Sequence, residues 1–215
     1  MAENYQVKQG DCISSIAFDH GHFPDTIWNH PNNAELKNQR KNENALMPND
    51  VVHVPDKRPK EVSGATNSVH KYRLKNTPAQ LRLQLLEDDK PKANLPYNLL
   101  VEGKQISKPG DRTDSRGFVI ATIPPFAKSG TLELIDGDVT TEYELKLGHL
   151  NPADEISGVK HRLNNLGFYE GPIDNNKDEE FKFAIRDYQE HFGLGSSGDL
   201  DQKTKDHLRQ KHDLI

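Results

Sequence analysis

Residues 163–174 read Leu-Asn-Asn-Leu-Gly-Phe-Tyr-Glu-Gly-Pro-Ile-Asp, and this stretch decides the fold of the C-terminal part of the chain. Apolar residues recur at helical spacing from Ile156 into this stretch and stop at Gly167, a residue typical of helix ends. After it, a second helical stripe stops at Gly193, and Asp201 is placed to cap a third helix. The apolar residues of the three stripes are Ile156, Val159, Leu163 and Leu166, then Phe181, Ala184, Ile185, Tyr188 and Phe192, then Leu208. We therefore expect a compact three-helix bundle over residues 151–215.

Two seams separate this bundle from the rest of the chain. Residues 57–68 are polar, contain Pro and Gly and show no apolar period, which indicates a solvated linker. A tighter junction follows Gly148, where Asn151 offers a helix cap and Pro152 stands at the first helical position. The predicted parts are an N-terminal module, the linker, a middle domain and the C-terminal bundle, at residues 1–56, 57–68, 69–148 and 151–215.

The middle domain has the two-residue period of β-strands. Apolar and polar side chains alternate around Leu81, Leu83 and Leu85, around Leu132 and Leu134, and around Tyr143, Leu145 and Leu147. Turn residues divide the segment into about seven short strands. We expect an antiparallel β-sandwich of the immunoglobulin-like or carboxypeptidase-regulatory-like kind. It is interpreted as a spacer, because its sequence has no nucleophile–base pair and no metal-ligand spacing.

The N-terminal module has the order strand, helix, helix, strand. Residues 5–17 have the pattern of a short strand, a Gly-Asp turn and a helix. A second helix is expected over residues 26–40, where Trp28 is predicted to pack in the core. Residues 51–54 form the closing strand. The expected fold class is therefore multidomain α+β, with a small βααβ module, an antiparallel β-sandwich and a three-helix bundle.

Composition excludes several classes of function. Lys and Arg number 28 against 33 Asp and Glu, for a net charge of −5, so nucleic acid is not an expected partner. No run of about 18 apolar residues occurs, so no membrane span is expected. The start of the sequence has neither the basic nor the apolar region of a signal peptide, and the lone Cys12 fits a reducing compartment. We expect synthesis in the cytoplasm.

No metal or other cofactor is expected. The loose set Cys12, His20, His22 and His30 lacks the short, fixed spacings of a zinc site. Cys12 has no base beside it in the sequence that would mark a thiol nucleophile.

The N-terminal module resembles the LysM family. The resemblance rests on Tyr5-x-Val7, Gly10-Asp11, Ile16-Ala17, Leu46-x-Pro48 and Val54-Pro55. It implies binding of N-acetylglucosamine polymers, such as peptidoglycan or chitin, in a shallow groove between two loops. The residues that the resemblance places in this groove are Gly10, Asp11, Cys12 and Ile13 on one side and Leu46, Met47, Pro48 and Asn49 on the other.

The C-terminal segment resembles the type 1 peptidoglycan-binding domain. Its marks are the stretch 163–174 quoted above, the pair Tyr188-Gln189 and the sequence Gly198-Asp199-Leu200-Asp201. The resemblance implies contact with a peptide stem or glycan, for which Tyr169, Asp174, Tyr188 and Gln189 are the candidates. Core packing is expected to take most of the surface of the two tyrosines, so Asp174 and Gln189 are the polar candidates.

Together these features favour a non-catalytic peptidoglycan-binding protein. More broadly, residues 27–33, 109–117 and 147–152 resemble LysM-containing proteins associated with type VI secretion spikes, which implies delivery to the periplasm or the exterior by a contractile injection machine. An adaptor or chaperone that binds a spike component or effector protein is the alternative hypothesis. A cell-wall hydrolase with an unrecognised site is the second alternative, although the sequence has no His-Glu-x-x-His or Gly-x-Ser-x-Gly motif.

Overall fold

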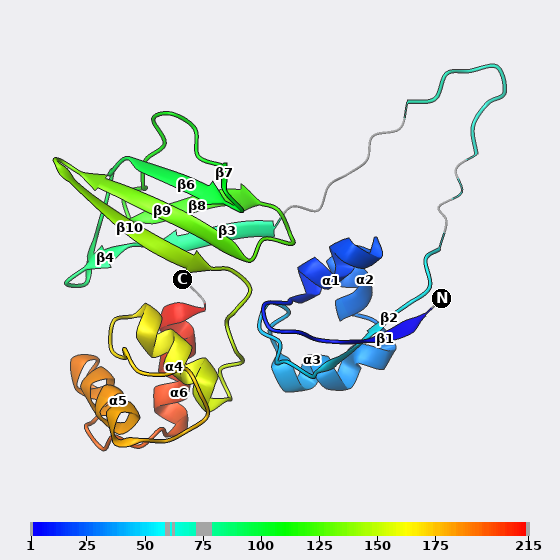
Figure 1. Cartoon of the computed structure of the whole chain (residues 1–215). Helices are drawn as coiled ribbons and strands as arrows, with labels where there is room; N and C mark the ends of the chain where they lie inside the picture. The colour runs from blue at the N-terminus through cyan, green and yellow to red at the C-terminus, as the bar shows by residue number, and fades with distance from the viewer. Residues whose placement is uncertain (1, 59–60, 62, 72–78, 214–215) are drawn as a thin grey trace. The chain divides into compact units, whose positions relative to one another are not determined.

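The computed structural model describes residues 2–58, 61, 63–71 and 79–213 (Figure 1). The fold is mixed α+β with helices and small antiparallel sheets, as predicted. The chain divides into two compact units, Met1–Asn44 with Pro48–Gly148 and Ala45–Met47 with His149–Ile215. Among the described residues, no helix has the length and apolar character needed to cross a lipid bilayer.

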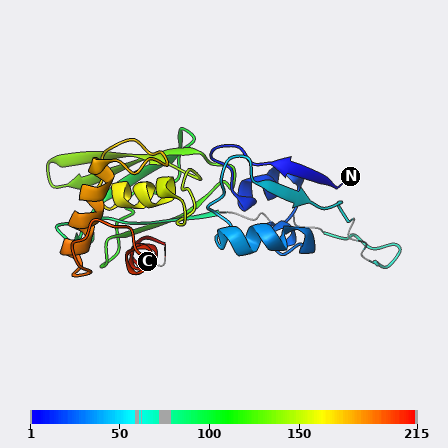
Figure 2. The ribbon, with the colours of Figure 1, turned by 90° about the horizontal axis from the view of Figure 1, so that it is seen from below.

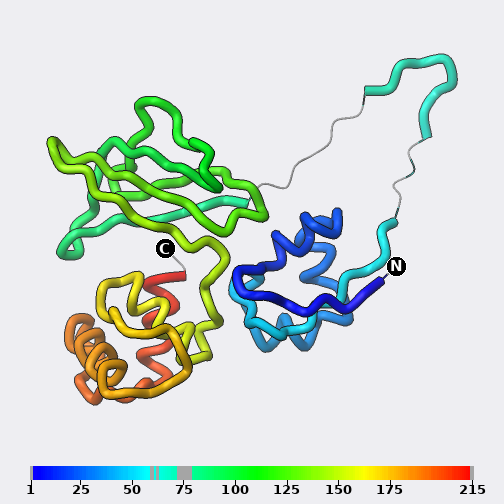
Figure 3. Tube along the Cα trace, in the orientation of Figure 1, coloured from blue at the N-terminus to red at the C-terminus, as the bar shows by residue number. Residues whose placement is uncertain are grey.

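The N-terminal module is a two-stranded antiparallel sheet with helices between its strands. The elements are β1 (Glu3–Gln6), α1 (Ile13–His20), α2 (Pro24–Trp28), a 3-10 helix η1 (Pro31–Asn33), α3 (Ala34–Arg40) and β2 (Val51–Val54). Tyr5 of β1 lies opposite Val52 of β2, and the two strands run side by side as the dark blue and cyan tubes of Figure 3. Trp28 is 7% exposed, which confirms its predicted place in the core.

The single helix predicted over residues 26–40 is wrong, because the chain breaks there into α2, η1 and α3. Pro31 has no N–H to continue the hydrogen-bond ladder of α2 and stands at the start of η1. The buried Asn33 side chain then holds the break, because its Nδ2 donates to the carbonyls of Ile27 and His53 and its Oδ1 accepts from His53 N. One amide thus joins the end of α2 to strand β2.

The middle segment is built of short antiparallel strands. They are β3 (Ala79–Gln84), β4 (Leu86–Glu87), β5 (Lys90–Pro91), β6 (Tyr97–Val101), β7 (Lys104–Gln105), β8 (Phe118–Ile123), β9 (Ser129–Asp136) and β10 (Val139–Lys146). One sheet has the order β10-β9-β6-β7, and β3 pairs with β8 in a second. Leu81 and Val119 from the second sheet share one core with Leu99 and Leu132 from the first. The two sheets therefore pack through their apolar faces.

The described residues of the predicted linker 57–68 lie in neither a helix nor a strand. Residues 59, 60 and 62 of that linker, and residues 72–78 at the start of the predicted middle domain, lie outside the described part of the chain.

The C-terminal bundle has the three predicted helices: α4 (Ile156–Asn165), α5 (Glu179–His191) and α6 (Gln202–His212). In Figure 2, α4 runs across the view, α5 runs up it and α6 is seen nearly end-on, so the helix axes cross steeply. Gly167 and Gly193 both have a left-handed backbone just beyond the helix ends, which a side chain would strain. The core consists of Val159, Leu163, Tyr169, Phe181, Ala184, Ile185, Tyr188 and Leu208.

The predicted start of the first of these helices at Asn151 is wrong, because α4 begins at Ile156 with Glu155 as its cap residue. The Asn151 side chain donates instead to Ser157 Oγ at 3.0 Å. Residues 152–155 form a turn, in which Glu155 N donates to Pro152 O. This turn packs tightly against α4, since a Cβ added at Gly158 would lie 1.8 Å from Pro152 O.

Candidate functional site

The predicted N-terminal groove begins in the loop after β1. Gly10 has φ 85°, a turn conformation that favours glycine, and Ile13 N donates to Glu43 O at 3.0 Å. Val7 O accepts from Asn49 N at 2.9 Å, so Asn49 lies beside the start of this loop. Gly10, Asp11 and Ile13 are buried, Cys12 and Pro48 are half-buried, and Asn49 is exposed. Leu46 is buried and Met47 half-buried, and both belong to the second compact unit.

The carboxylate of Asp11 is occupied by groups of its own unit. It accepts from Tyr5 OH at 2.8 Å, from Lys8 N at 2.9 Å and from Lys128 Nζ at 3.2 Å. Burial by itself raises the pKa of Asp11, but these hydrogen bonds outweigh it and the pKa is lowered. Burial and the bond to Asp11 raise the pKa of Tyr5 to about 12. A sugar that approached Asp11 would have to replace one of these partners.

Two of the candidate residues in the C-terminal domain are core aromatics. Tyr169 is 2% exposed, and its hydroxyl donates to Pro172 O at 3.0 Å. Tyr188 is fully buried, and its hydroxyl lies 2.7 Å from His207 Nδ1. Burial raises the pKa of the Tyr188 hydroxyl. Both rings therefore pack in the core.

Gln189 is also buried, and its amide binds the loop that leads into α6. Its Nε2 donates to Asp199 O at 2.9 Å and to Thr204 Oγ1 at 3.0 Å, while its Oε1 accepts from Gly198 N at 2.9 Å. Asp201 caps α6 by accepting from Thr204 N at 2.7 Å. The Gln189 side chain thus positions both the loop and the first turn of the next helix.

Asp174 is partly exposed and belongs to a loop that a buried polar side chain holds, as Gln189 holds the loop before α6. The fully buried Lys160 side chain places its Nζ 2.7 Å from Asp174 Oδ1 and 3.3 Å from Asp178 Oδ2. Its Nζ also lies 5.1 Å from the centre of the Tyr169 ring and 5.6 Å from that of Phe181, which are cation–π distances. The Lys160 amine therefore connects α4 to the loop before α5.

The charges of this group support each other. Burial lowers the pKa of Lys160, but its hydrogen bonds to Asp174, Tyr169 and Asp178 outweigh burial and the pKa is raised. The bond from Lys160 lowers the pKa of Asp174. Asp178 also caps α5 by accepting from Phe181 N at 2.8 Å. Sequence reasoning missed Lys160, and its only signal is its place beside Val159 within an otherwise apolar helix face.

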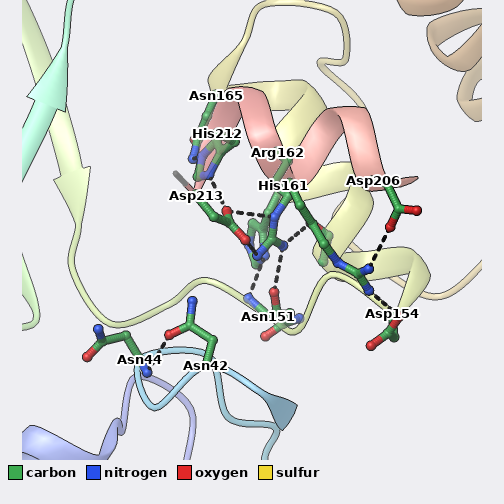
Figure 4. A network of polar contacts seen from close by, with 12 residues as sticks. Asn42, Asn44, Asn151, Asp154, His161, Arg162, Asn165, Asp206, His212 and Asp213 are labelled. Carbon is green, nitrogen blue, oxygen red and sulfur yellow. Dashed lines mark hydrogen bonds and ion pairs between the residues drawn. The ribbon is translucent and has the colours of Figure 1, made fainter. Parts of the chain in front are cut away.

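A second buried cation, Arg162, joins the two ends of the domain (Figure 4). Its Nη1 donates to the carbonyls of Asn151 and Gly158 at 2.9 and 2.8 Å. Its Nε and Nη2 form a paired contact with the two carboxylate oxygens of Asp213, at 3.0 and 2.8 Å. Arg162 thereby links the segment before α4 to the residue after α6.

The part of the chain that the structure describes holds no group of three or more His, Cys, Asp or Glu side chains suited to a metal ion. His20 lies 2.9 Å from Glu3 Oε1, and His30 stacks on His53 with 4.7 Å between ring centres.

Comparison with known proteins identifies the C-terminal domain. Residues 152–208 match the model of a family described as "Putative peptidoglycan binding domain". The match covers α4, α5 and most of α6, and it confirms the predicted peptidoglycan-binding domain in this part of the chain. No curated protein and no solved structure matches the chain. The LysM module and the association with a secretion spike stay predictions.

Proposed function

We propose that this chain is a non-catalytic peptidoglycan-binding protein that attaches to the cell wall through its C-terminal domain. The family match at residues 152–208 carries the proposal. The domain also has the rigidity that binding requires, since buried polar side chains of α4 and α5 fix the loops before α5 and α6. A binding surface held in advance loses little conformational entropy when its ligand arrives.

The N-terminal module is proposed to add a second, weak glycan contact of the LysM kind. Its two strands pair antiparallel, and the helices α1, α2 and α3 lie between them in the chain, which supports this proposal. Two weak sites on one chain bind a repeating polymer more tightly than either does alone, provided that both can reach it together. Peptidoglycan is such a polymer.

The proposal extends to a setting. The resemblance of residues 27–33, 109–117 and 147–152 to spike-associated proteins favours a chain made in the bacterial cytoplasm and delivered by a contractile injection machine. The absence of the sequence motifs of metal-dependent and serine hydrolases supports a binding role.

Sedimentation of the full chain with purified sacculi tests the proposal. We expect the protein to pellet with sacculi and to release no soluble muropeptide, which chromatography of the supernatant measures. Gly158→Ala, which disrupts the packing of α4, should reduce pelleting, whereas Lys177→Ala on the surface of the same domain should not. Release of muropeptides would show a hydrolase. Failure of the wild-type chain to pellet would overturn the proposal and favour the adaptor hypothesis.

A further inference from the structure

The C-terminal domain carries a group of aromatic and basic side chains that are not completely buried in its core. Phe168, Phe192 and His207 are half-buried, and His191 and Lys211 are exposed. We call these five residues, together with Lys203, the aromatic–basic face. They come from the loop after α4, the end of α5 and one side of α6.

The rings of this face form one continuous cluster. The ring centre of His191 lies 5.3 Å from that of Phe168 and 4.6 Å from that of Phe192. The ring centre of His207 lies 4.9 Å from that of Phe192, and Lys211 Nζ stands 4.8 Å from the Phe192 ring centre. Since these side chains remain partly exposed, solvent reaches a surface of ring faces and edges beside a cation.

Three basic residues of α6 are aligned on this face. Lys203, His207 and Lys211 follow each other at four-residue intervals, which places them along one side of the helix over about 12 Å. Burial lowers the pKa of His207, and the positive charges of Lys211 and Lys203 lower it further. The electric field of the two lysines therefore reaches His207.

This local positive charge contrasts with the domain around it. Residues 151–215 contain 9 Lys and Arg against 13 Asp and Glu. A basic stripe on an acidic domain attracts an anionic ligand such as a carboxylate. It offers no such attraction to an uncharged ligand. Aromatic side chains next to it offer an apolar surface for the flat side of a sugar or for an alkyl side chain.

We propose that the aromatic–basic face is the site where this domain holds a carboxylate-bearing peptidoglycan fragment. The sugar or peptide backbone lies against Phe168 and Phe192, and the carboxylates of the peptide stem pair with Lys203 and Lys211. The inference rests on the proposed function and makes it specific: the face replaces the buried residues Tyr169, Tyr188 and Gln189 as the contact surface.

Binding of two soluble probes to the full chain, measured by isothermal titration calorimetry, tests this site. The first probe is a disaccharide–tetrapeptide muropeptide, which carries carboxylates, and the second is an uncharged N-acetylglucosamine tetramer. The double variant Lys203→Glu, Lys211→Glu should weaken muropeptide binding roughly tenfold or more, because two ion pairs become repulsions. Binding of the uncharged tetramer should change by less than about twofold. Raising the salt concentration should weaken only the first interaction.

Matched variants separate the face from general effects on charge and folding. The double variant Lys177→Glu, Lys205→Glu makes the same change of charge elsewhere on the domain and should bind the muropeptide as the wild type does. Phe192→Leu should weaken binding while keeping apolar packing, whereas Phe183→Leu removes an exposed ring outside the face and should have no effect. Circular dichroism melting checks that each variant is folded.

The outcomes distinguish the site from the function. Weakening by the face variants and not by their controls supports the site. If the wild type binds the muropeptide and sacculi, but the face variants bind as their controls do, the site is refuted and the proposed function stands. If the wild type binds neither, the proposed function fails and the site with it.

Discussion

Replacement of Gln189 by Leu is expected to unfold the C-terminal domain at a much lower temperature. Leucine is an apolar side chain of similar bulk, and it lacks both hydrogen-bonding groups of the amide. Gly198 N–H and Thr204 Oγ1 are buried, and each loses its hydrogen-bond partner in the amide. The substitution also removes the bond to Asp199 O.

The magnitude follows from the burial of these partners. A buried polar group that loses its partner costs about 1–3 kcal/mol, so the two buried groups together give a loss of about 2–6 kcal/mol in the free energy of unfolding. The partly hydrated Asp199 carbonyl adds little, because water can take the place of the amide. For a domain of this size the loss corresponds to a fall of about 8 °C or more in Tm.

Differential scanning calorimetry of the full chain measures this change, with Gln210→Leu as the control. Gln210 is exposed on α6, so the same chemical change there should alter the free energy of unfolding of the domain by less than about 0.5 kcal/mol. If the Tm of Gln189→Leu lies within about 3 °C of that of Gln210→Leu, the amide does not hold the loop and the reasoning is refuted.

Three further changes test other parts of the structure. Gly158→Ala should cost about 3 kcal/mol or more in chemical denaturation, because the new methyl group collides with Pro152 O; a cost below about 1 kcal/mol would contradict this packing. The pKa of Asp213 lies below its usual 3.8, because burial raises it but the bonds from His212 and Arg162 outweigh burial. Its ion pair therefore stabilises the fold above about pH 4, and that stability is lost as the pH falls further. Asp213→Asn should therefore flatten the acid limb of a stability–pH profile, and an unchanged limb would argue against the pair. Asn33→Ala should lower the stability of the N-terminal module by about 2–4 kcal/mol in hydrogen exchange, while protection of α4 and α5 stays as in the wild type.

The helices of the C-terminal domain could be predicted because their signals are local. An apolar stripe at helical spacing, Gly167 or Gly193 after the last turn and Asp201 before the first all act within a few residues along the chain. The start of α4 was placed too early, at Asn151, because an Asn-Pro pair has the form of a helix cap. In the structure that side chain donates to Ser157 Oγ instead, and α4 begins only at Ile156.

The candidate site was harder to predict because exposure does not follow from residue type. Phe168 and Tyr169 are neighbours in the sequence, and yet Phe168 is half-buried at the surface while Tyr169 packs in the core. Similarly, Gln189 has the polarity of a ligand contact, but folding surrounds it with its own loop. Which of two adjacent aromatics reaches solvent depends on how the helices cross.

The sequence by itself determined the kind of each part: a βααβ module, antiparallel strands and a helical domain with the pattern of a peptidoglycan binder. These features depend on periodicity and on residues that start or stop an element. Both signals involve residues that are close together along the chain. Only the tertiary structure decided that Lys160 and Arg162 are buried and that Lys211 of α6 stands beside the half-buried ring of Phe192. The carboxylates that pair with the two buried cations lie 14 to 51 residues away in the chain, a separation that no local pattern records.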